Sequence, residues 1–166
     1  MTFTNVAEIE KAGFSGFRKM DELFADSSVI PKTKGVYFVL YTANKPPVFL
    51  TVGTGGYFKD QNPNVPVARL KENWVDNTIV IYIGKAGKDG SSATLQSRLR
   101  EYFWFGKGGD VGHTSGRFIW QLKNSKDLVV CWKTLPTQDP HTVESDLIRQ
   151  FVSEFGKRPY ANLSGG

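Results

Sequence analysis

The run TIVIYIG at residues 78–84 is the strongest signal for a buried β-strand in this sequence. It combines β-branched and aromatic residues without a charge, which favours a strand that is covered on both faces. Residues 35–42, GVYFVLYT, have the same character and are bounded by turn-forming residues, so we expect a second strand there. Strands of this kind need other elements to cover them, and we therefore expect a fold built around a central sheet.

Weaker patterns predict the remaining elements. Residues 5–26 are typical of one or two short helices interrupted by a turn near residues 13–16, where a Gly-Phe pair is repeated. A short helical segment is expected at residues 68–74, after a loop at residues 60–66. Further strands are expected at residues 47–56 (an edge strand or hairpin arm), 118–122 and 127–135, the last two separated by a turn at residues 124–126.

Two longer helices are predicted from capping residues and apolar spacing. Ser92 is expected to cap a helix that runs to about Trp104, and a glycine-rich loop follows at residues 106–116. The inner face of this helix is formed by Leu95, Leu99, Tyr102 and Phe103.

The last helix has the clearest limits. Asp139 is the expected N-cap, Pro140 occupies the first helical position, and Gly156 ends the helix. Glu144 is placed at the edge of its apolar face, which is formed by Leu147, Ile148, Phe151 and Phe155.

The chain of 166 residues is expected to form one domain with one core. We expect an α+β fold, within the broad α/β class, with a small mixed or antiparallel central sheet flanked by helices. A single cysteine excludes an internal disulfide. No apolar run approaches the roughly 18 residues of a membrane span, and the N-terminus lacks the pattern of a signal peptide, so no membrane contact and a cytoplasmic location are expected.

Several common catalytic motifs can be excluded. GTGGYF departs from the dinucleotide-binding pattern at Phe58, and no glycine-rich segment ends in the GK[ST] of a phosphate loop. The residues around Ser115, GHTSG, lack the pattern of a hydrolase nucleophile. Cys131 lies in an apolar strand and is expected to be a core thiol, and His113 and His141 alone do not make a zinc site.

The charge distribution favours a polyanionic partner. The chain has 21 basic and 16 acidic residues, a net charge of +5. Basic residues are concentrated at residues 85–117, beside four consecutive aromatic residues, 102–105. This pattern suits nucleic acid, and a solvated helix face beside a core stripe explains it equally well. The residues expected to contact nucleic acid are Lys88, Arg100, Lys107, His113 and Arg117.

One ordered set of residues stands out along the chain. It comprises Tyr37 in GVY, Tyr82 and Lys85 in YIGK, Arg98 and Tyr102 in RLREYF, Glu144 on the last helix, and Asn162 near the end. Taken singly, each has an ordinary structural explanation, such as a strand tyrosine or a helix ion pair. Their joint order resembles that of the GIY-YIG nuclease family, over about residues 35–163.

The chemistry of these side chains suits phosphodiester hydrolysis. Glu144 offers a hard oxygen ligand for one Mg²⁺ or Mn²⁺, with a water-rich coordination shell. Arg98 is permanently charged and can contact two phosphate oxygens. Tyr37 is the best candidate for the base that accepts the proton of the attacking water, with Lys85 as the cation that would assist its ionisation.

The resemblance implies further roles and a function. It makes Tyr82 and Tyr102 positioning residues for phosphate or water, and Asn162 an orienting hydrogen-bond partner. It also implies a metal-dependent endonuclease, with double-stranded DNA as the expected partner. The alternative is a nucleic-acid-binding module on the same scaffold, with little or no cleavage.

The chain departs from the compact family pattern in one respect. The tyrosines of the two strand motifs are 45 positions apart, so we expect an insertion at about residues 42–78 within a nuclease core at residues 35–163. Doubling a surface loop costs only about 0.6 kcal/mol of closure entropy, so the insertion is tolerable. Residues 1–34 are expected to form a helical extension, and its role and that of the insertion stay open.

Overall fold

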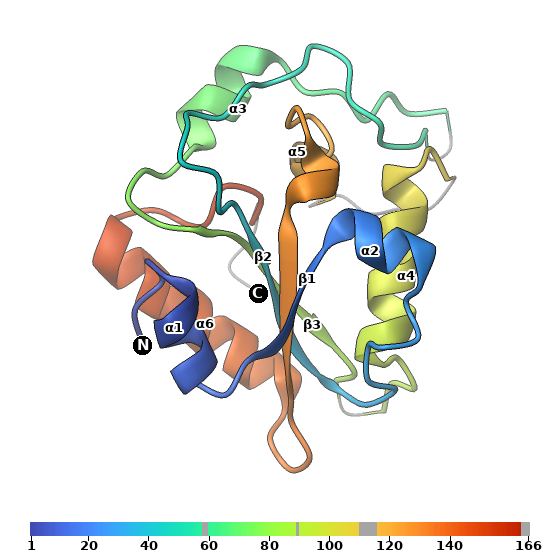
Figure 1. Cartoon of the computed structure of the whole chain (residues 1–166), viewed down its shortest axis with the longest axis vertical. Coiled ribbons are helices and arrows are strands. Elements are labelled where there is room, and N and C mark those ends of the chain that lie inside the picture. The colour runs from blue at the N-terminus through green and yellow to red at the C-terminus, as the bar shows by residue number, and fades with distance from the viewer. Residues whose placement is uncertain (58–59, 89, 110–115, 164–166) are drawn as a thin grey trace.

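The computed structural model describes residues 1–57, 60–88, 90–109 and 116–163. Its centre is a four-stranded antiparallel sheet with helices on both faces (Figure 1), which confirms the expected α+β class. The strands, in spatial order, are β1 (Ser15–Lys19), β4 (Val129–Thr134), β2 (Gly35–Leu40) and β3 (Val80–Ala86). The helices are α1 (Val6–Lys11), α2 (Met20–Ala25), α3 (Val67–Asn73), α4 (Leu95–Gly106), α5 (Gly116–Ile119) and α6 (Pro140–Phe155), with a 3₁₀ turn, η1, at Ser125–Asp127.

Side-chain alternation along β2 divides the core into two layers. Val36, Phe38 and Leu40 belong to the apolar cluster that also contains residues of α1 and α6. Tyr37 and Val39 belong to the other cluster, which includes the inner face of α4. Figure 1 shows α1 and α6 on one side of the sheet and α2 and α4 on the other. All six residues of β2 are buried, as expected for a covered central strand.

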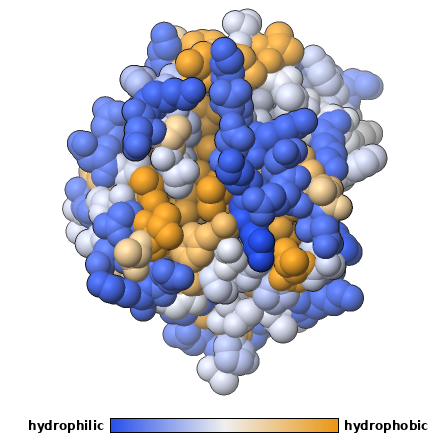
Figure 2. Space-filling model, viewed as in Figure 1, coloured by the Kyte–Doolittle hydropathy of each residue, from blue (hydrophilic) through white to orange (hydrophobic). Residues whose placement is uncertain are grey.

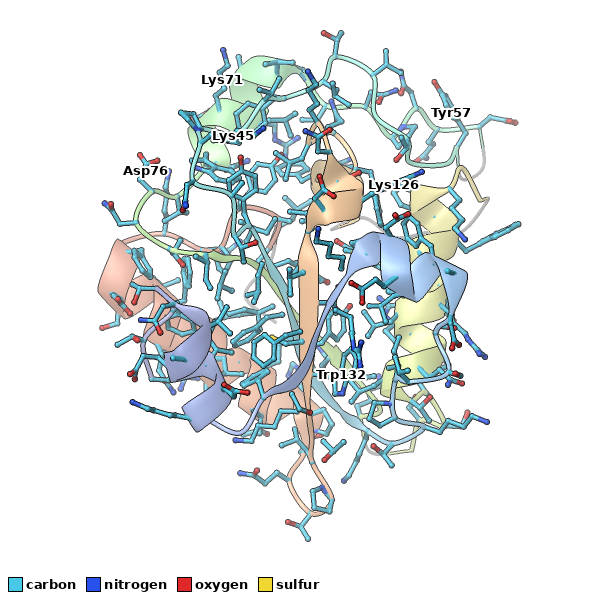
Figure 3. The ribbon with its side chains drawn as sticks, viewed as in Figure 1. Lys45, Tyr57, Lys71, Asp76, Lys126 and Trp132 are labelled. Atoms are coloured by element: carbon cyan, nitrogen blue, oxygen red, sulfur yellow. The ribbon has the colours of Figure 1, made fainter. Side chains whose placement is uncertain are left out.

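The prediction that residues 1–34 form a helical extension was wrong in part, because this segment also contains a strand. Residues 15–19, predicted to include a turn, form the edge strand β1 and pair with β4. A bulge interrupts this pairing, and both Gly16 and Phe17 have positive φ angles there. Trp132 of β4 packs against Gly16 and points to the α4 side of the sheet (Figure 3). Pairing with β4, which is distant in sequence, decided the structure of this segment.

The two long helices show how local caps set their limits. The Asp139 carboxylate accepts a hydrogen bond from the amide of Thr142 at 3.1 Å, and Gly156 ends α6 with a φ of 77°. For α4 the predicted cap, Ser92, was wrong. Thr94 is the N-cap, because its hydroxyl accepts from the amide of Ser97 while the Ser97 hydroxyl accepts from the Thr94 amide, a reciprocal capping box.

Residues 42–78, expected from the sequence to be an insertion and called so below, pack onto the end of the sheet. The insertion runs across the top of the molecule in Figure 1, and Figure 3 labels Tyr57, Lys71 and Asp76 along it. The predicted strand at residues 47–56 is replaced by irregular structure, and the one at residues 118–122 by the end of α5 and a turn. The two segments are joined by a β-bridge between Phe49 and Leu122 and by backbone hydrogen bonds, such as that from the Leu50 amide to the Gln121 carbonyl at 2.6 Å.

A buried glutamine holds the insertion against the segment that follows α5. The Gln121 side chain accepts a hydrogen bond from the Val65 amide at 2.7 Å and donates to the carbonyls of Leu50 and Val65. Residues 118–120 are all buried, without the alternation of a half-exposed strand. The side chain of Gln121 therefore ties residues 50 and 65 together by satisfying their buried or partly buried backbone groups.

The surface is mixed in character. On the face shown in Figure 2, hydrophilic residues predominate and apolar residues reach the surface in separate patches between them. Among the described residues, no helix has both the length and the apolar composition needed to span a membrane.

Candidate active site

The pairing of β2 with β3 brings the two tyrosine motifs together across the insertion. Tyr37 lies directly opposite Gly84, and Gly35 lies opposite Ala86. A Cβ atom on Gly84 would lie closer to Cζ of Tyr37 than two carbon atoms can approach. The glycine therefore provides the space that this ring occupies. The motifs thus form one packed unit, although their tyrosines are 45 positions apart in sequence.

Three tyrosines form a layer beneath the surface at this point. The rings of Tyr82 and Tyr102 are stacked, with centroids 5.7 Å apart and an interplanar angle of 14°. The centroid of the Tyr37 ring lies 5.9 Å from that of Tyr82, and the two rings are tilted by 58°. Tyr37 and Tyr102 have no exposed surface, whereas Tyr82 is 6% exposed. Tyr82 is therefore the member of this layer that reaches solvent.

The surroundings of Tyr37 disfavour its ionised form. Burial raises its pKa well above the ordinary value of 10.0, and Tyr82 raises it further, while Arg98 acts in the opposite direction. Burial likewise raises the pKa of Tyr102. A general base needs a pKa near the working pH, so both hydroxyls stay protonated and neither is suited to that role in this state of the protein.

A cleft of about 540 Å³ opens beside Tyr82. It lies at β3, the edge strand of the sheet, so side chains from both faces can reach it. Arg98 comes from α4 on one face and Glu144 from α6 on the other. The expected site residues that line the cleft are Tyr82, Lys85, Arg98, Glu144 and Asn162, joined by Lys88.

An ion pair between Lys85 and Glu144 closes one wall of the cleft. The Lys85 ammonium donates a short hydrogen bond to Oε2 of Glu144. The Glu144 side chain is 7% exposed and that of Lys85 29%. A buried carboxylate requires such a partner, because desolvation of an unpaired charge is expensive. Any cation that binds Glu144 has to share or replace this contact.

Arg98 faces the cleft from the opposite wall. Burial acts to lower the pKa of its guanidinium, but Tyr37, Tyr82 and the Glu101 carboxylate together raise it, so the net shift is upward. Its Nη1 lies 3.1 Å from Oε2 of Glu101. The guanidinium is therefore a fixed positive charge beside the tyrosine layer, suited to an anion in the cleft.

Asn162 holds the edge of β3. Its side-chain oxygen accepts from the amide of Ile83 at 2.9 Å, and its nitrogen donates to the carbonyl of the same residue at 2.8 Å. The amide of Ala161 also donates to the carbonyl of Ile81. The C-terminal segment thus covers the open edge of the sheet and fixes the backbone between Tyr82 and Lys85, so Asn162 is a positioning residue.

Two of the expected nucleic-acid contacts lie outside this cleft. Arg100 donates to the hydroxyl of Ser27 at 2.8 Å, and Lys107 lies 4.8 Å from the centroid of the Phe24 ring. Both line a separate hollow between α2 and α4. The adjacent aromatic run is mostly core, since only Trp104 of residues 102–105 is exposed.

Of the remaining expected contacts, one more lies outside the cleft and one lies outside the described residues. Arg117 lies on α5, away from the cleft, with its guanidinium 5.8 Å from the centroid of the Phe118 ring. His113 lies outside the described residues. Cys131 is buried in β4, and burial raises the pKa of its thiol, which confirms a core role.

The cleft contains one acidic residue that the sequence prediction missed. Glu101 lines it and pairs with Arg98. The signal was present in the sequence, because residues three apart on a helix are neighbours. Within the described residues, no group of three or more His, Cys, Asp or Glu side chains is arranged to hold a metal ion. A cation at Glu144 would therefore take most of its ligands from water and substrate.

Comparisons with protein-family models, with curated proteins and with solved structures find no match to this chain.

Proposed function

We propose that the protein is a metal-dependent endonuclease that hydrolyses phosphodiester bonds in DNA. The observation that supports this best is the convergence of Tyr82, Lys85, Arg98 and Glu144 on one cleft from β3, α4 and α6. These residues were selected from the sequence by their order alone. Their convergence supplies a cation for the phosphate, a phenol, and a carboxylate within the same space.

The cleft has the donor chemistry for a single hard cation. Mg²⁺ usually keeps several waters and binds through one or two carboxylates together with substrate phosphates. Glu144 is the carboxylate that would hold Mg²⁺ or Mn²⁺, and a cleft of about 540 Å³ has room for water ligands and a phosphate. When bound there, the ion would neutralise charge on the phosphate and on the leaving oxygen.

The residues of the chain then divide the work of hydrolysis. Water forms a new bond to phosphorus, and the bond to the leaving oxygen breaks with its electron pair. The attacking water gives up one proton to the solvent of the cleft, and the leaving oxygen takes one up from it. Arg98 binds the phosphate oxygens as negative charge builds up. Lys85 lines the same cleft and would supply a second positive charge to this phosphate when its contact with Glu144 is given up.

The three tyrosines have different parts in this proposal. Tyr82 is the phenol that lines the cleft, so its hydroxyl is placed to contact the attacking water or the phosphate. Tyr37, expected from the sequence to act as the base, has no exposed surface, and burial raises its pKa. We therefore assign Tyr37 and Tyr102 to positioning Tyr82, and assign the contact with water to Tyr82 itself.

Cleavage of supercoiled plasmid tests the proposal. Purified protein is incubated with plasmid in Mg²⁺, Mn²⁺ or EDTA, beside the variants Glu144→Gln and Arg98→Ala. We expect metal-dependent nicking that falls at least about 100-fold in each variant, in line with the loss of a principal charge-stabilising group. Glu154→Gln is the matched control, since Glu154 lies on the same helix but is exposed and outside the cleft.

The outcome also separates the two functional hypotheses. Full activity in Glu144→Gln or Arg98→Ala, with the fold intact by circular dichroism, would refute the assignment. Salt-dependent DNA binding that is unaffected by Glu144→Gln, with no product in either metal, would identify a nucleic-acid-binding module instead.

A further inference from the structure

A second hollow adjoins the cleft at Asn162. It has a volume of about 600 Å³ and lies between α3 and the segment that follows α6. Asn162 lines both hollows, so they meet at this residue. Three cations line the second hollow: Arg69 from α3, and Lys157 and Arg158 from the segment after α6. Glu72 of α3 also lines it, so three positive charges face one negative charge. We refer to it as the basic groove.

The cations of the basic groove are not neutralised by carboxylates. Lys157 donates to the backbone carbonyl of Glu72 at 2.9 Å, and Arg158 to that of Leu163 at 2.8 Å. Over the part of the chain that the structure describes, no ion pair includes either residue or Arg69. A carbonyl satisfies a donor without cancelling its charge, so the groove retains a positive potential.

A fourth cation borders the groove. The guanidinium carbons of Arg69 and Arg117 lie 5.5 and 5.8 Å from the centroid of the Phe118 ring. Burial, and then the charge of Arg69, lower the pKa of Arg117. The Nε of Arg117 is buried and has no hydrogen-bond partner among the described residues. An anion that binds between or beside the two guanidinium groups would reduce the repulsion between their like charges.

We propose that the basic groove binds the phosphates of the DNA strand that flank the scissile phosphate. This inference rests on the proposed endonuclease function, since it places the scissile phosphate in the adjoining cleft. Each strand of a duplex carries one phosphate per 3.4 Å of helix axis, so a strand that passes Asn162 must bring further phosphates into the basic groove. The insertion thereby acquires a role, because it supplies Arg69.

Equilibrium binding tests the proposal without requiring cleavage. The probe is a fluorescein-labelled 30-base-pair duplex of mixed sequence, measured by fluorescence anisotropy in EDTA at graded KCl. The test variant replaces Arg69, Lys157 and Arg158 by Gln. Loss of three phosphate contacts should reduce the slope of log affinity against log salt by about 2.7, at about 0.9 per contact, and weaken binding about tenfold or more at low salt.

A matched variant controls for net charge. Replacing Lys11, Arg18 and Lys126 by Gln also removes three positive charges, but from residues outside both hollows. Its slope should stay within experimental error of that of the unchanged protein. An equal change of slope in both variants, or none in the test variant, would overturn the proposal, as would failure of the unchanged protein to bind the duplex.

The binding and cleavage experiments fail independently. Absence of plasmid cleavage, together with the expected change of slope, would leave the groove as a DNA-binding surface and refute the nuclease. Cleavage that depends on Glu144, together with an unchanged slope in the test variant, would support the nuclease and refute the groove. Poly-glutamate should compete only weakly, and competition equal to that of the duplex would indicate an acidic protein partner instead.

Discussion

Replacement of Tyr37 by phenylalanine should make the protein less sensitive to alkaline pH. Tyr37 has no exposed surface, and burial raises the pKa of its hydroxyl well above 10.0. Above pH 10 the unfolded chain releases this proton and the folded chain keeps it, so the unfolded state is favoured progressively. The stabilisation due to Tyr37 is therefore complete below about pH 10 and is lost as the pH rises toward the folded pKa.

The size of this effect follows from proton linkage. For a group with an unfolded pKa of about 10 that stays protonated when folded, the free energy of unfolding falls by about 1.4 kcal/mol between pH 8 and pH 11. Tyr102, Tyr160 and Cys131 also have raised pKa values and contribute equally in both proteins. The difference between Tyr37→Phe and the unchanged protein should therefore shift by about 1.4 kcal/mol over this range, in favour of the variant.

Urea unfolding followed by far-ultraviolet circular dichroism, at pH 8, 9, 10 and 11, measures this difference. Tyr57→Phe is the control, because Tyr57 is exposed in the folded protein and its substitution should leave the pH dependence unchanged. A difference between Tyr37→Phe and the unchanged protein that is constant across pH would show that Tyr37 ionises as readily when folded. That result would refute the burial argument and restore Tyr37 as a candidate base.

Two further predictions concern packing. Gly84→Ala should lower the free energy of unfolding by about 1–3 kcal/mol, because the added methyl group overlaps the Tyr37 ring. A melting temperature equal to that of the unchanged protein would contradict this packing. Gln121→Leu should lower the free energy of unfolding by about 3 kcal/mol or more, since two buried backbone groups of Val65 and the partly buried carbonyl of Leu50 lose their hydrogen-bond partner. Gln150→Leu, at an exposed position on α6, is its control in urea unfolding, and equal losses in the two variants would show that the buried network is unimportant.

Much of the candidate site could be predicted from sequence because its residues lie on elements with strong local signals. Five of the seven expected catalytic residues line the cleft. Four of them, Tyr82, Lys85, Arg98 and Glu144, lie on β3, α4 and α6, whereas Asn162 lies in the segment after α6. Their order along the chain was sufficient to select them. The depth of each side chain below the surface could not be predicted, since depth depends on which elements pack over it.

Tyr37 and Tyr102 illustrate this limit. Sequence reasoning gave Tyr37 the chemical role and Tyr82 a supporting one, whereas the structure exposes Tyr82 to the cleft and covers Tyr37 completely. The basic groove is a second example. Arg69 and Arg158 are 89 positions apart, and neither stands out in the sequence.

The sequence by itself determined the elements whose signals are local. Asp139, Pro140 and Gly156 set the limits of α6 through hydrogen bonds and backbone angles within a few residues, and the β-branched runs of β2 and β3 allow few alternatives. The tertiary structure alone decided that residues 15–19 form a strand and that residues 118–122 do not. Those outcomes depend on contacts with distant residues, as shown by the pairing of β1 with β4 and by the hydrogen bonds of Gln121.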